Sequence, residues 1–258
     1  MDIVVIANQK GGCAKTTTTV NLAAGLAERG QRVLVADLDP QANTTAWFKS
    51  SQSGASAGSW TVLHDQAAIL ALVTPTGLDG VDLLAGSRQL ANLEKALAGE
   101  LAVETRLKRA FATIPIDQYD VILIDTPPTL GLLTLNALTA AQWLLVPVTT
   151  HVMSLSGVAQ LLSTVADVKS LLNPDLKILG FVPCRVDTRT RHARDILQVL
   201  EDRFADQLCE THIRENIRIA EAPSFHESIL TYSGASGAAK DYRALAGEIQ
   251  TRLQMEKN

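Results

Sequence analysis

The sequence has few cysteines and no long apolar run. Cys13, Cys184 and Cys209 are the three cysteines of the 258-residue chain, and they form no CxxC pair. They therefore support neither a disulfide framework nor a zinc or iron–sulfur site. No stretch of about 18 apolar residues occurs, and the first residues lack the basic start and cleavage site of a signal peptide. We therefore expect a cytoplasmic protein with reduced thiols.

An excess of basic residues is also missing. Lysine and arginine total 23 against 27 aspartates and glutamates, which leaves a formal net charge of -4. Binding to DNA or to an anionic membrane would therefore require a local basic patch. The composition, 47% hydrophobic and 19% charged, suits one globular α/β domain with a substantial core. We expect residues 1–258 to form this single domain.

Short apolar runs alternate with helical patterns along the chain. The runs typical of buried strands are 2–7, 31–37, 81–84, 119–125, 143–148 and 177–183. Helical periodicity marks residues 16–29, 87–113, 129–141, 154–172 and 238–256. This alternation predicts an α/β fold with a doubly wound, mainly parallel sheet and helices on both faces. The Ser-, Gly- and Ala-rich stretch 49–60 has no apolar period and predicts a loop.

A glycine-rich stretch lies between the first predicted strand and the first predicted helix. Residues 9–17 read QKGGCAKTT, and backbone N–H groups placed there can wrap a polyphosphate at the positive end of a helix. In such a loop Lys15 reaches the β and γ phosphates, and the Thr16 hydroxyl ligands Mg²⁺. The stretch therefore predicts ATP and Mg²⁺ as cofactors. The predicted nucleotide-binding residues are Lys10, Gly11, Gly12, Cys13, Ala14, Lys15, Thr16 and Thr17.

This loop departs from the usual GxxxxGK[ST] pattern. Gln9 stands where the pattern has its first glycine, and Ala14 replaces the last one. A positive φ at Ala14 would cost roughly 1 kcal/mol or more, so we expect a helical φ there. Cys13 lies among lysines at a helix N-terminus, which can lower a thiol pKa. The competing interpretation, which we favour, is a small apolar filler.

Lys10, beside the first glycine, indicates a second lysine near the phosphates. With it the sequence strongly resembles the ParA/MinD family of deviant Walker A ATPases, whose motif is KGGxGK[ST][TS]. The resemblance implies that Lys10 reaches across a dimer interface to the nucleotide of the partner subunit. ATP would thereby join two subunits in a sandwich. It also implies weak hydrolysis of ATP to ADP and phosphate, with Lys10, Lys15 and Asp39 as the catalytic residues.

Aspartates end two buried strands. Asp37 and Asp39 lie in the sequence DLDPQ, and Asp125 ends YDVILID. A carboxylate that ends a buried strand needs a partner. The family's DxDPQ motif matches, which implies that Asp39 orients the attacking water and Asp37 supports the magnesium shell. Asp125 resembles the Walker B acid, with residues 126–128 (TPP) as the γ-phosphate switch. The predicted metal residues are therefore Thr16, Asp37 and Asp125; the alternative is a set of turn carboxylates facing solvent.

Arginines gather in two regions of the C-terminal half. They are Arg185, Arg189, Arg191, Arg194, Arg214 and Arg218. Such a group can neutralise DNA phosphates without reading the bases. In the family that the chain resembles, arginines in these regions form a nonspecific DNA surface that is complete only in the ATP dimer. The competing interpretation is a solvated surface with intramolecular ion pairs.

The resemblance covers nearly the whole chain. Residues 172–177 (LNPDLK) and 216–224 (NIRIAEAPS) look like the ParA segments before the sixth strand and near the nucleotide base. The second separates ParA-like chains from MinD, from bacterial tyrosine kinases and from iron–sulfur carriers. The last predicted helix has balanced charges and no Phe or Trp, which argues against membrane anchoring. The phosphate loop begins at residue 9, so we expect the short form of the family, without an N-terminal helix-turn-helix.

These patterns together predict a ParA-type ATPase that forms a homodimer on ATP binding. It would bind double-stranded DNA of the nucleoid nonspecifically, and a ParB-like or other adaptor protein would release it by stimulating hydrolysis. The cargo would be a chromosome or plasmid, or a protein assembly such as a carboxysome or chemotaxis cluster. Two alternatives of another class are a MinD-like membrane-associated regulator and a small-molecule ATP-dependent ligase or kinase.

Overall fold

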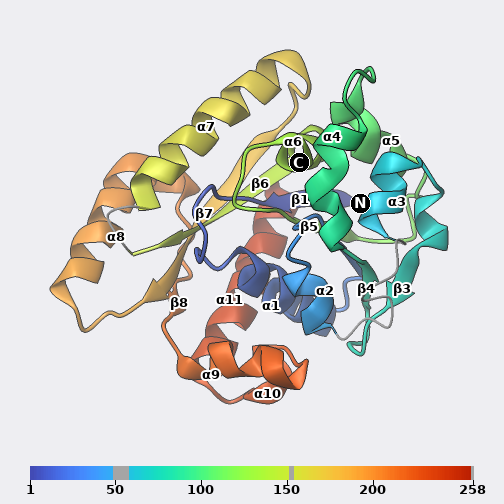
Figure 1. The fold of residues 1–258 in the computed structure, drawn as a ribbon. Coiled ribbons are helices and arrows are strands. Elements are labelled where there is room, and N and C mark those ends of the chain that lie inside the picture. The colour runs from blue at the N-terminus through green and yellow to red at the C-terminus, as the bar shows by residue number, and fades with distance from the viewer. Residues whose placement is uncertain (49–57, 151–153, 257–258) are drawn as a thin grey trace.

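An eight-stranded sheet forms the centre of the computed structural model, which describes residues 1–48, 58–150 and 154–256 (Figure 1). The strands are β1 (Asp2–Ile6), β2 (Val33–Asp37), β3 (Val73–Pro75), β4 (Val81–Leu84), β5 (Val121–Asp125), β6 (Trp143–Thr149), β7 (Lys177–Val186) and β8 (Ile213–Arg214). Their order across the sheet is β3-β4-β2-β5-β1-β6-β7-β8. Every neighbouring pair is parallel except β3 and β4. The predicted doubly wound, mainly parallel sheet is confirmed.

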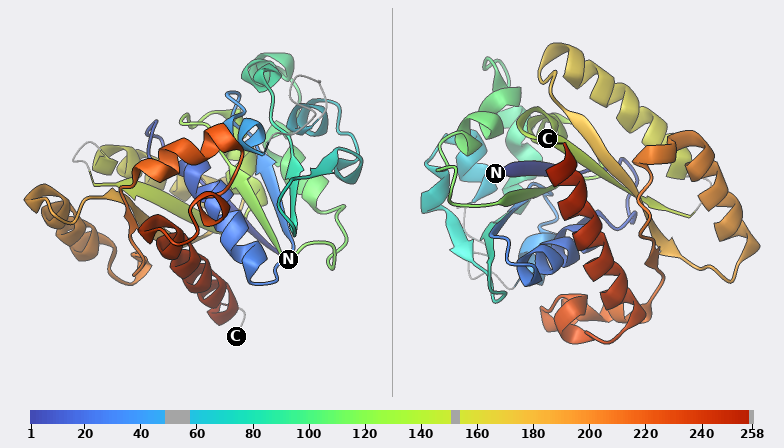
Figure 2. Two further views of the ribbon diagram at one scale, coloured as in Figure 1. Left: turned by 90° about the horizontal axis from the view of Figure 1, so that it is seen from below. Right: turned by 180° about the vertical axis from the view of Figure 1, so that it is seen from behind.

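Helices cover both faces of this sheet (Figure 2). The α-helices are α1 (Lys15–Glu28), α2 (Asn43–Trp47), α3 (Ser59–His64), α4 (Leu93–Ala96), α5 (Arg106–Phe111), α6 (Leu132–Ala140), α7 (Ser154–Leu171), α8 (Arg191–Phe204), α9 (Ile217–Glu221), α10 (Ile229–Tyr232) and α11 (Gly237–Met255). Short 3₁₀ turns are η1 (Ile69–Ala71), η2 (Arg88–Asn92), η3 (Val103–Thr105), η4 (Ala205–Gln207) and η5 (Ala222–Phe225). Helices α1, α10 and α11 pack on one face, and α5 to α8 pack on the other.

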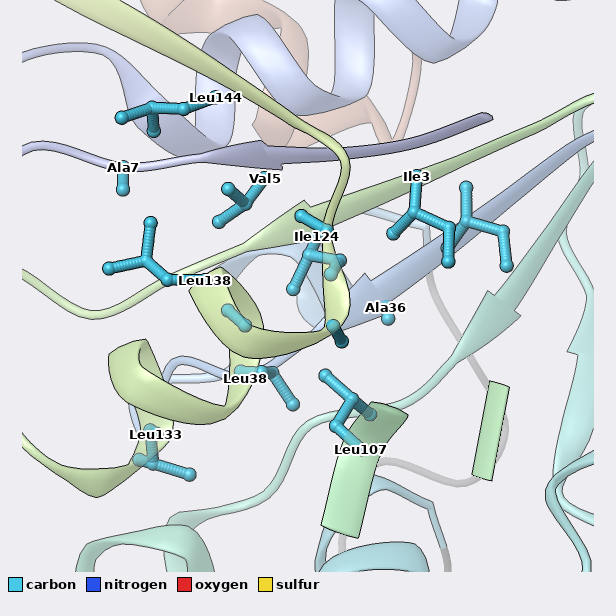
Figure 3. Packing of buried hydrophobic residues seen from close by; sticks show 14 of the residues in the cluster. Ile3, Val5, Ala7, Ala36, Leu38, Leu107, Ile124, Leu133, Leu138 and Leu144 are labelled. Carbon is cyan, nitrogen blue, oxygen red and sulfur yellow. The ribbon is translucent and has the colours of Figure 1, made fainter. Parts of the chain in front are cut away.

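Alternate residues of the central strands enter two separate apolar clusters. In β1, Ile3 and Val5 face the cluster that includes Leu138 and Leu107 (Figure 3). The neighbouring Val4 and Ile6 face the cluster on the other side of the sheet. Successive side chains of a strand point to opposite faces, so a strand covered on both sides is apolar throughout. This is why the buried strands could be found as continuous apolar runs.

The structure corrects three details of the predicted elements. The helix predicted over 87–113 is wrong: η2, α4, η3 and α5 occupy this region, and Gly99 and Ala102 interrupt it with φ values of 86° and 54°. The edge strands β3 and β8 were not predicted, because two or three residues show no measurable period. Most of the predicted loop 49–60 lies outside the described residues, but its last two positions begin α3.

Helices α1 and α11 lie side by side behind the sheet (Figure 2, right). Gly25 of α1 allows this approach, because a Cβ built there would lie 2.7 Å from the Cβ of Ala246 and 3.2 Å from the carbonyl oxygen of Tyr242. Contacts shorter than about 3.0 Å do not occur in real packing. The glycine therefore sets the distance between the helix that follows the phosphate loop and the C-terminal helix.

We expect Gly25→Ala to lower the free energy of unfolding by about 1–3 kcal/mol, because the added methyl group forces α1 and α11 apart. Gly247→Ala in α11 is the matched control. A Cβ added at Gly247 would lie 3.5 Å from its nearest neighbour, Nη1 of Arg29, so the methyl group fits. The better helix propensity of alanine should then raise the free energy of unfolding by up to about 1 kcal/mol. Urea unfolding measures both changes. Equal shifts for the two variants would contradict the close-packing role of Gly25.

Candidate nucleotide-binding site

Three neighbouring strands bring the predicted site residues to one edge of the sheet. The phosphate loop follows β1, while Asp37 ends β2 and Asp125 ends β5. Strand β5 lies between β1 and β2, and the register pairs Asp125 with both Ile6 and Asp37. The carboxyl ends of parallel strands are where open α/β sheets bind ligands. The sequence-predicted loop and carboxylates therefore do converge.

Asn8 anchors the phosphate loop, which leads into α1 at Lys15. The Asn8 side-chain amide donates to the carbonyl oxygen of Pro147, and its Oδ1 accepts from the backbone N–H of Lys10. The Lys15 side chain is buried, with Nζ 3.4 Å from the carbonyl oxygen of Lys10 and 3.9 Å from the sulfur of Cys13. An ammonium group folded over its own loop is placed to meet phosphate oxygens at the start of a helix.

The backbone of Ala14 contradicts the expected helical conformation. Its φ is 72° and its ψ is 25°, which is left-handed, and Gly12 of the same loop also has a φ of 72°. Ala14 is the N-cap of α1, and its carbonyl oxygen accepts the first helical hydrogen bond from the N–H of Thr18. Ala14 thus keeps a glycine-type conformation although it carries a Cβ, at a cost of about 1–2 kcal/mol.

Cys13 is a buried filler and not an activated thiol. Only 1% of its surface is exposed. Burial raises the pKa of its thiol, and this effect outweighs the opposing attraction of Lys15. The favoured interpretation of Cys13 is therefore confirmed.

Asp125 is fully buried, and two hydroxyl groups solvate one of its oxygens. Thr16 and Thr44 donate to Oδ2 over 2.8 Å and 2.6 Å, while Oδ1 has no partner among the described residues. Burial raises the pKa of Asp125 to about 6, against the lowering effect of these hydroxyls and of Lys15. An orphaned buried oxygen beside the Thr16 hydroxyl fits a magnesium ion bound through water.

The remaining magnesium ligands would come from phosphates and water. Within residues 1–48, 58–150 and 154–256, no group of three or more His, Cys, Asp and Glu side chains is placed to hold a metal. Mg²⁺ usually keeps several waters and takes one or two protein ligands plus substrate phosphates. Thr16 would bind the ion directly and Asp125 would hold it through water.

Asp37 is engaged in holding the backbone around it. Its Oδ2 accepts from both the N–H and the hydroxyl of Thr45, and its Oδ1 accepts from the N–H of Asp39. Gly86 approaches so closely that a Cβ there would lie 2.7 Å from the Asp37 Cγ. Burial and the neighbouring Asp125 raise the pKa of Asp37 to about 7. This geometry favours a supporting role for Asp37 over direct metal contact.

Asp39 reaches the site from the turn after β2. Its side chain is 7% exposed and lines the nucleotide cavity, and its Oδ1 accepts from the N–H of Gln41. Pro40 and this Asx-type bond fix the turn. A carboxylate held at the cavity wall in this way is placed to orient a water molecule.

A cavity of about 840 Å³ extends from the phosphate loop to α9. Its phosphate end is formed by Gly11 to Thr17 and Asp39. The opposite end includes Ile217, Ile219 and Pro223 of the ParA-like stretch 216–224, together with Cys184, Ile213 and Tyr242, which were not predicted from the sequence. No motif marks the last three, because β7, β8 and α11 bring them to the cavity only in the folded chain.

The six predicted DNA-binding arginines separate into groups. Arg185 and Arg214 line the cavity, where they pair with Glu215 and Asp241. Arg189 pairs with Asp187, and Arg191 lies 4.0 Å from Asp195. Both are exposed, so these pairs contribute little. Arg194 and Arg218 are exposed and make no ion pair with the described part of the chain.

We expect Ala14→Gly to raise the free energy of unfolding by up to about 1 kcal/mol. Relief of about 1–2 kcal/mol of left-handed strain is partly offset by the greater chain entropy of glycine when unfolded. Ala24→Gly, in the middle of α1, is the control and should lower stability by about 1 kcal/mol or more. Thermal and urea unfolding measure both. Destabilisation by Ala14→Gly would contradict the strained geometry.

Comparison with known proteins identifies related chains. Residues 1–178 match a family model described as an AAA domain. The chain is 41% identical over 251 residues to the chromosome-partitioning ATPase Soj of Thermus thermophilus, covering 97% of this chain and 96% of that protein. It is 37% identical over 250 residues to the chromosome partitioning protein ParA of Myxococcus xanthus, covering 97% and 88%.

Solved structures agree with this assignment. Cobyrinic acid a,c-diamide synthase from Mycobacterium smegmatis, with bound ATP analog and magnesium, superposes with a TM-score of 0.78 at 36% identity, covering 92% of this chain and 98% of that one. Apo McdA from Cyanothece has a TM-score of 0.85 at 23% identity over 98% and 99%, which shows the fold alone. With a phosphate loop, its carboxylates and relatives matched over nearly their full length, the chain belongs to the ParA family of ATPases.

Proposed function

We propose that this ATPase cycles between a monomer and an ATP-bound dimer that binds DNA nonspecifically, and that an adaptor protein ends the bound state by stimulating hydrolysis. The observation that carries the proposal is the division of the two loop lysines. Lys15 lines the nucleotide cavity of its own chain, whereas the described lining begins at Gly11 and does not include Lys10. Lys10 is partly exposed in the same loop, and from there a lysine could reach a nucleotide bound to a second subunit.

Hydrolysis in this site would rest on positioning and on charge. Bound Mg²⁺ would neutralise phosphate charge, with Thr16 and Asp125 as the residues that hold it. Lys15 would contact the phosphates, and Asp39 would orient the attacking water. These are the roles predicted from the sequence, and the convergence of all four side chains at one sheet edge supports them.

The proposed DNA surface is the exposed arginine group at the end of β7 and the start of α8. Arg189, Arg191 and Arg194 are all exposed there, and Arg218 of α9 is a further exposed arginine that we assign to this surface. Arg185 and Arg214 are tied to acids at the cavity and contribute less to it. Because each subunit offers few phosphate contacts, two subunits held together would bind far more tightly than one.

Chromosome or plasmid partition is the cargo function that we propose. Relatives at 37–41% identity carry chromosome-partitioning names. The names of these relatives mention neither a carboxysome nor a chemotaxis cluster, so positioning of such a protein assembly has less support. We also propose that the protein is nucleoid-associated, through the arginine surface.

The name of the Mycobacterium smegmatis structure favours a small-molecule ligase as a second candidate. A diamide synthase that took nitrogen from glutamine on its own chain would need a reactive thiolate. All three cysteines here are buried, and burial raises the pKa of each thiol. The lack of a reactive thiolate makes the ligase the weaker candidate. Measuring ATP hydrolysis with DNA, and separately with cobyrinic acid and glutamine, distinguishes the partition ATPase from the ligase.

A membrane-bound regulator is disfavoured by the C-terminal helix. Leu245, Ile249 and Leu253 of α11 are at most 3% exposed, because they pack against the sheet. The apolar face of α11 is therefore already used in the core. In the described part of the chain no helix has the length and apolarity needed to span a bilayer.

Lys10→Ala should bind ATP with wild-type affinity but fail to dimerise, because the lost ammonium group would act on the nucleotide of the other subunit. Light scattering with a nonhydrolysable ATP analog measures the dimer, and a fluorescent analog measures binding. Lys15→Ala is the control, since loss of the cavity lysine should abolish binding as well. Normal dimerisation of Lys10→Ala would contradict the cross-subunit role.

The double variant Arg194→Glu, Arg218→Glu should lose DNA retention while it keeps ATP-driven dimerisation. Each lost phosphate contact should also make log K about 0.9 less dependent on log salt concentration. Lys95→Glu, Lys108→Glu carries the same charge change on α4 and α5, which lie near the opposite edge of the sheet from α8 (Figure 1), and should retain DNA.

DNA retention is measured with ATP and ADP at two salt concentrations. Equal loss in the two double variants would show a net-charge effect and would refute the proposed surface. Equal retention of the wild type with ATP and with ADP would refute the nucleotide-controlled cycle itself.

A further inference from the structure

Helix α2 contacts both buried carboxylates of the nucleotide site. It begins directly after the Asp39 turn, where Ala42 has a φ of 51°. Thr44 donates its hydroxyl hydrogen to the Oδ2 of Asp125, and Thr45 donates to Asp37. Both threonine side chains are buried, with at most 1% exposed. One end of this short helix is therefore fixed by the carboxylates that a magnesium nucleotide would approach.

The other end of α2 is attached to the segment from α9 to α10, residues 217–232. The indole N–H of Trp47 donates to the carbonyl oxygen of Glu227 over 2.8 Å, and Nδ1 of His226 lies 3.0 Å from the carbonyl oxygen of Ala46. Trp47 is only 5% exposed. In Figure 1 this segment forms the lower edge of the molecule, beneath α1 and α2.

The 217–232 segment carries an exposed surface that the core does not use. Ile217 is 74% exposed and Phe225 is 59% exposed, although both are large apolar residues. Arg218 is exposed beside them and belongs to the proposed DNA surface. Ile217 also lines the nucleotide cavity, so a nucleotide can contact this segment directly as well as through α2.

We propose that Thr44 is a positioning residue for Asp125, and that α2 carries the state of this carboxylate through Trp47 to the 217–232 segment. The link from this segment to DNA rests on the proposed function. The coupling between Thr44 and the segment does not.

The hydroxyl arrangement around Asp125 would change on magnesium binding. Thr16 and Thr44 share Oδ2 of Asp125 in this structure. If the Thr16 hydroxyl held magnesium, Thr44 would orient this oxygen alone. Helix α2 has five residues and little more than one turn. A displacement of Thr44 would therefore also displace Ala46 and Trp47 in the same turn.

A competing route to the same segment passes through α1. Oδ1 of Asn21 accepts from the N–H of Ile229, and its amide donates to the carbonyl oxygen of Thr17. Position between two sites does not by itself establish coupling. The experiment must therefore distinguish α2 from α1.

Thr44→Val removes the hydroxyl and keeps the side-chain volume. Thr139→Val is the matched control, because Thr139 is equally buried and its hydroxyl has no partner among the described residues. Thr44→Ser restores a hydroxyl and should restore the wild-type response. Trp47→Phe removes the N–H that reaches Glu227 and keeps an aromatic ring in the core.

Amide hydrogen exchange of residues 217–232 is measured without nucleotide, with ATP and EDTA, and with saturating Mg²⁺ and ATP, saturation being verified by titration. In the wild type and in Thr139→Val, Mg²⁺ with ATP should change exchange of the segment by about fivefold or more. Thr44→Val and Trp47→Phe should lose most of this response although they are saturated. DNA retention with ATP is measured on the same variants.

Each outcome decides one claim. A full response in both Thr44→Val and Trp47→Phe would overturn the role of α2 and leave Asn21, or direct contact of the nucleotide with the cavity-lining Ile217, Ile219 and Pro223, as the route. Absence of a response in the wild type would overturn it as well. An intact exchange response in a wild-type protein that does not retain DNA would refute the proposed DNA function and leave the α2 coupling standing.

Discussion

The burial of two carboxylates at the ends of neighbouring strands is the constraint on which the rest of the site depends. Asp37 and Asp125 are completely buried and adjacent in register. Charges placed there without partners would be unstable. Threonine hydroxyls and backbone N–H groups satisfy three of their four oxygens, and burial raises both pKa values toward neutrality. The fourth oxygen, Oδ1 of Asp125, is left for a ligand.

Several local features follow from this need for partners. Thr44 and Thr45 bring α2 against the sheet edge, and Gly86 leaves room for the Asp37 side chain. The carbonyl oxygen of Asp37 accepts from Ser59 at the start of α3. Elements distant in the sequence are thus held in place by the two aspartates buried beside the phosphate loop, so a change in the charge at this edge reaches more than the catalytic groups.

The phosphate loop shows how far the chain tolerates departures from its family's pattern. Cys13 replaces no essential group, because its side chain fills a buried space behind the loop. Ala14 keeps a left-handed backbone in which a glycine would be relaxed. The strain persists because the strand before the loop and the helix after it determine the path of the chain. Strain of this kind is common at ligand sites, where the surrounding structure imposes it.

The sequence by itself determined the buried strands, the loop before α1 and the residues of the phosphate end, because apolar runs, glycine pairs and strand-ending aspartates are local signals. Folding decided what has no local signal. The apolar end of the cavity, the partners Thr44 and Thr45, and the ion pairs of Arg185 and Arg214 join residues distant in the sequence. The φ of Ala14 was predicted wrongly because a residue's own preference was weighed without the neighbouring elements, and tertiary packing outweighs a preference of about 1 kcal/mol.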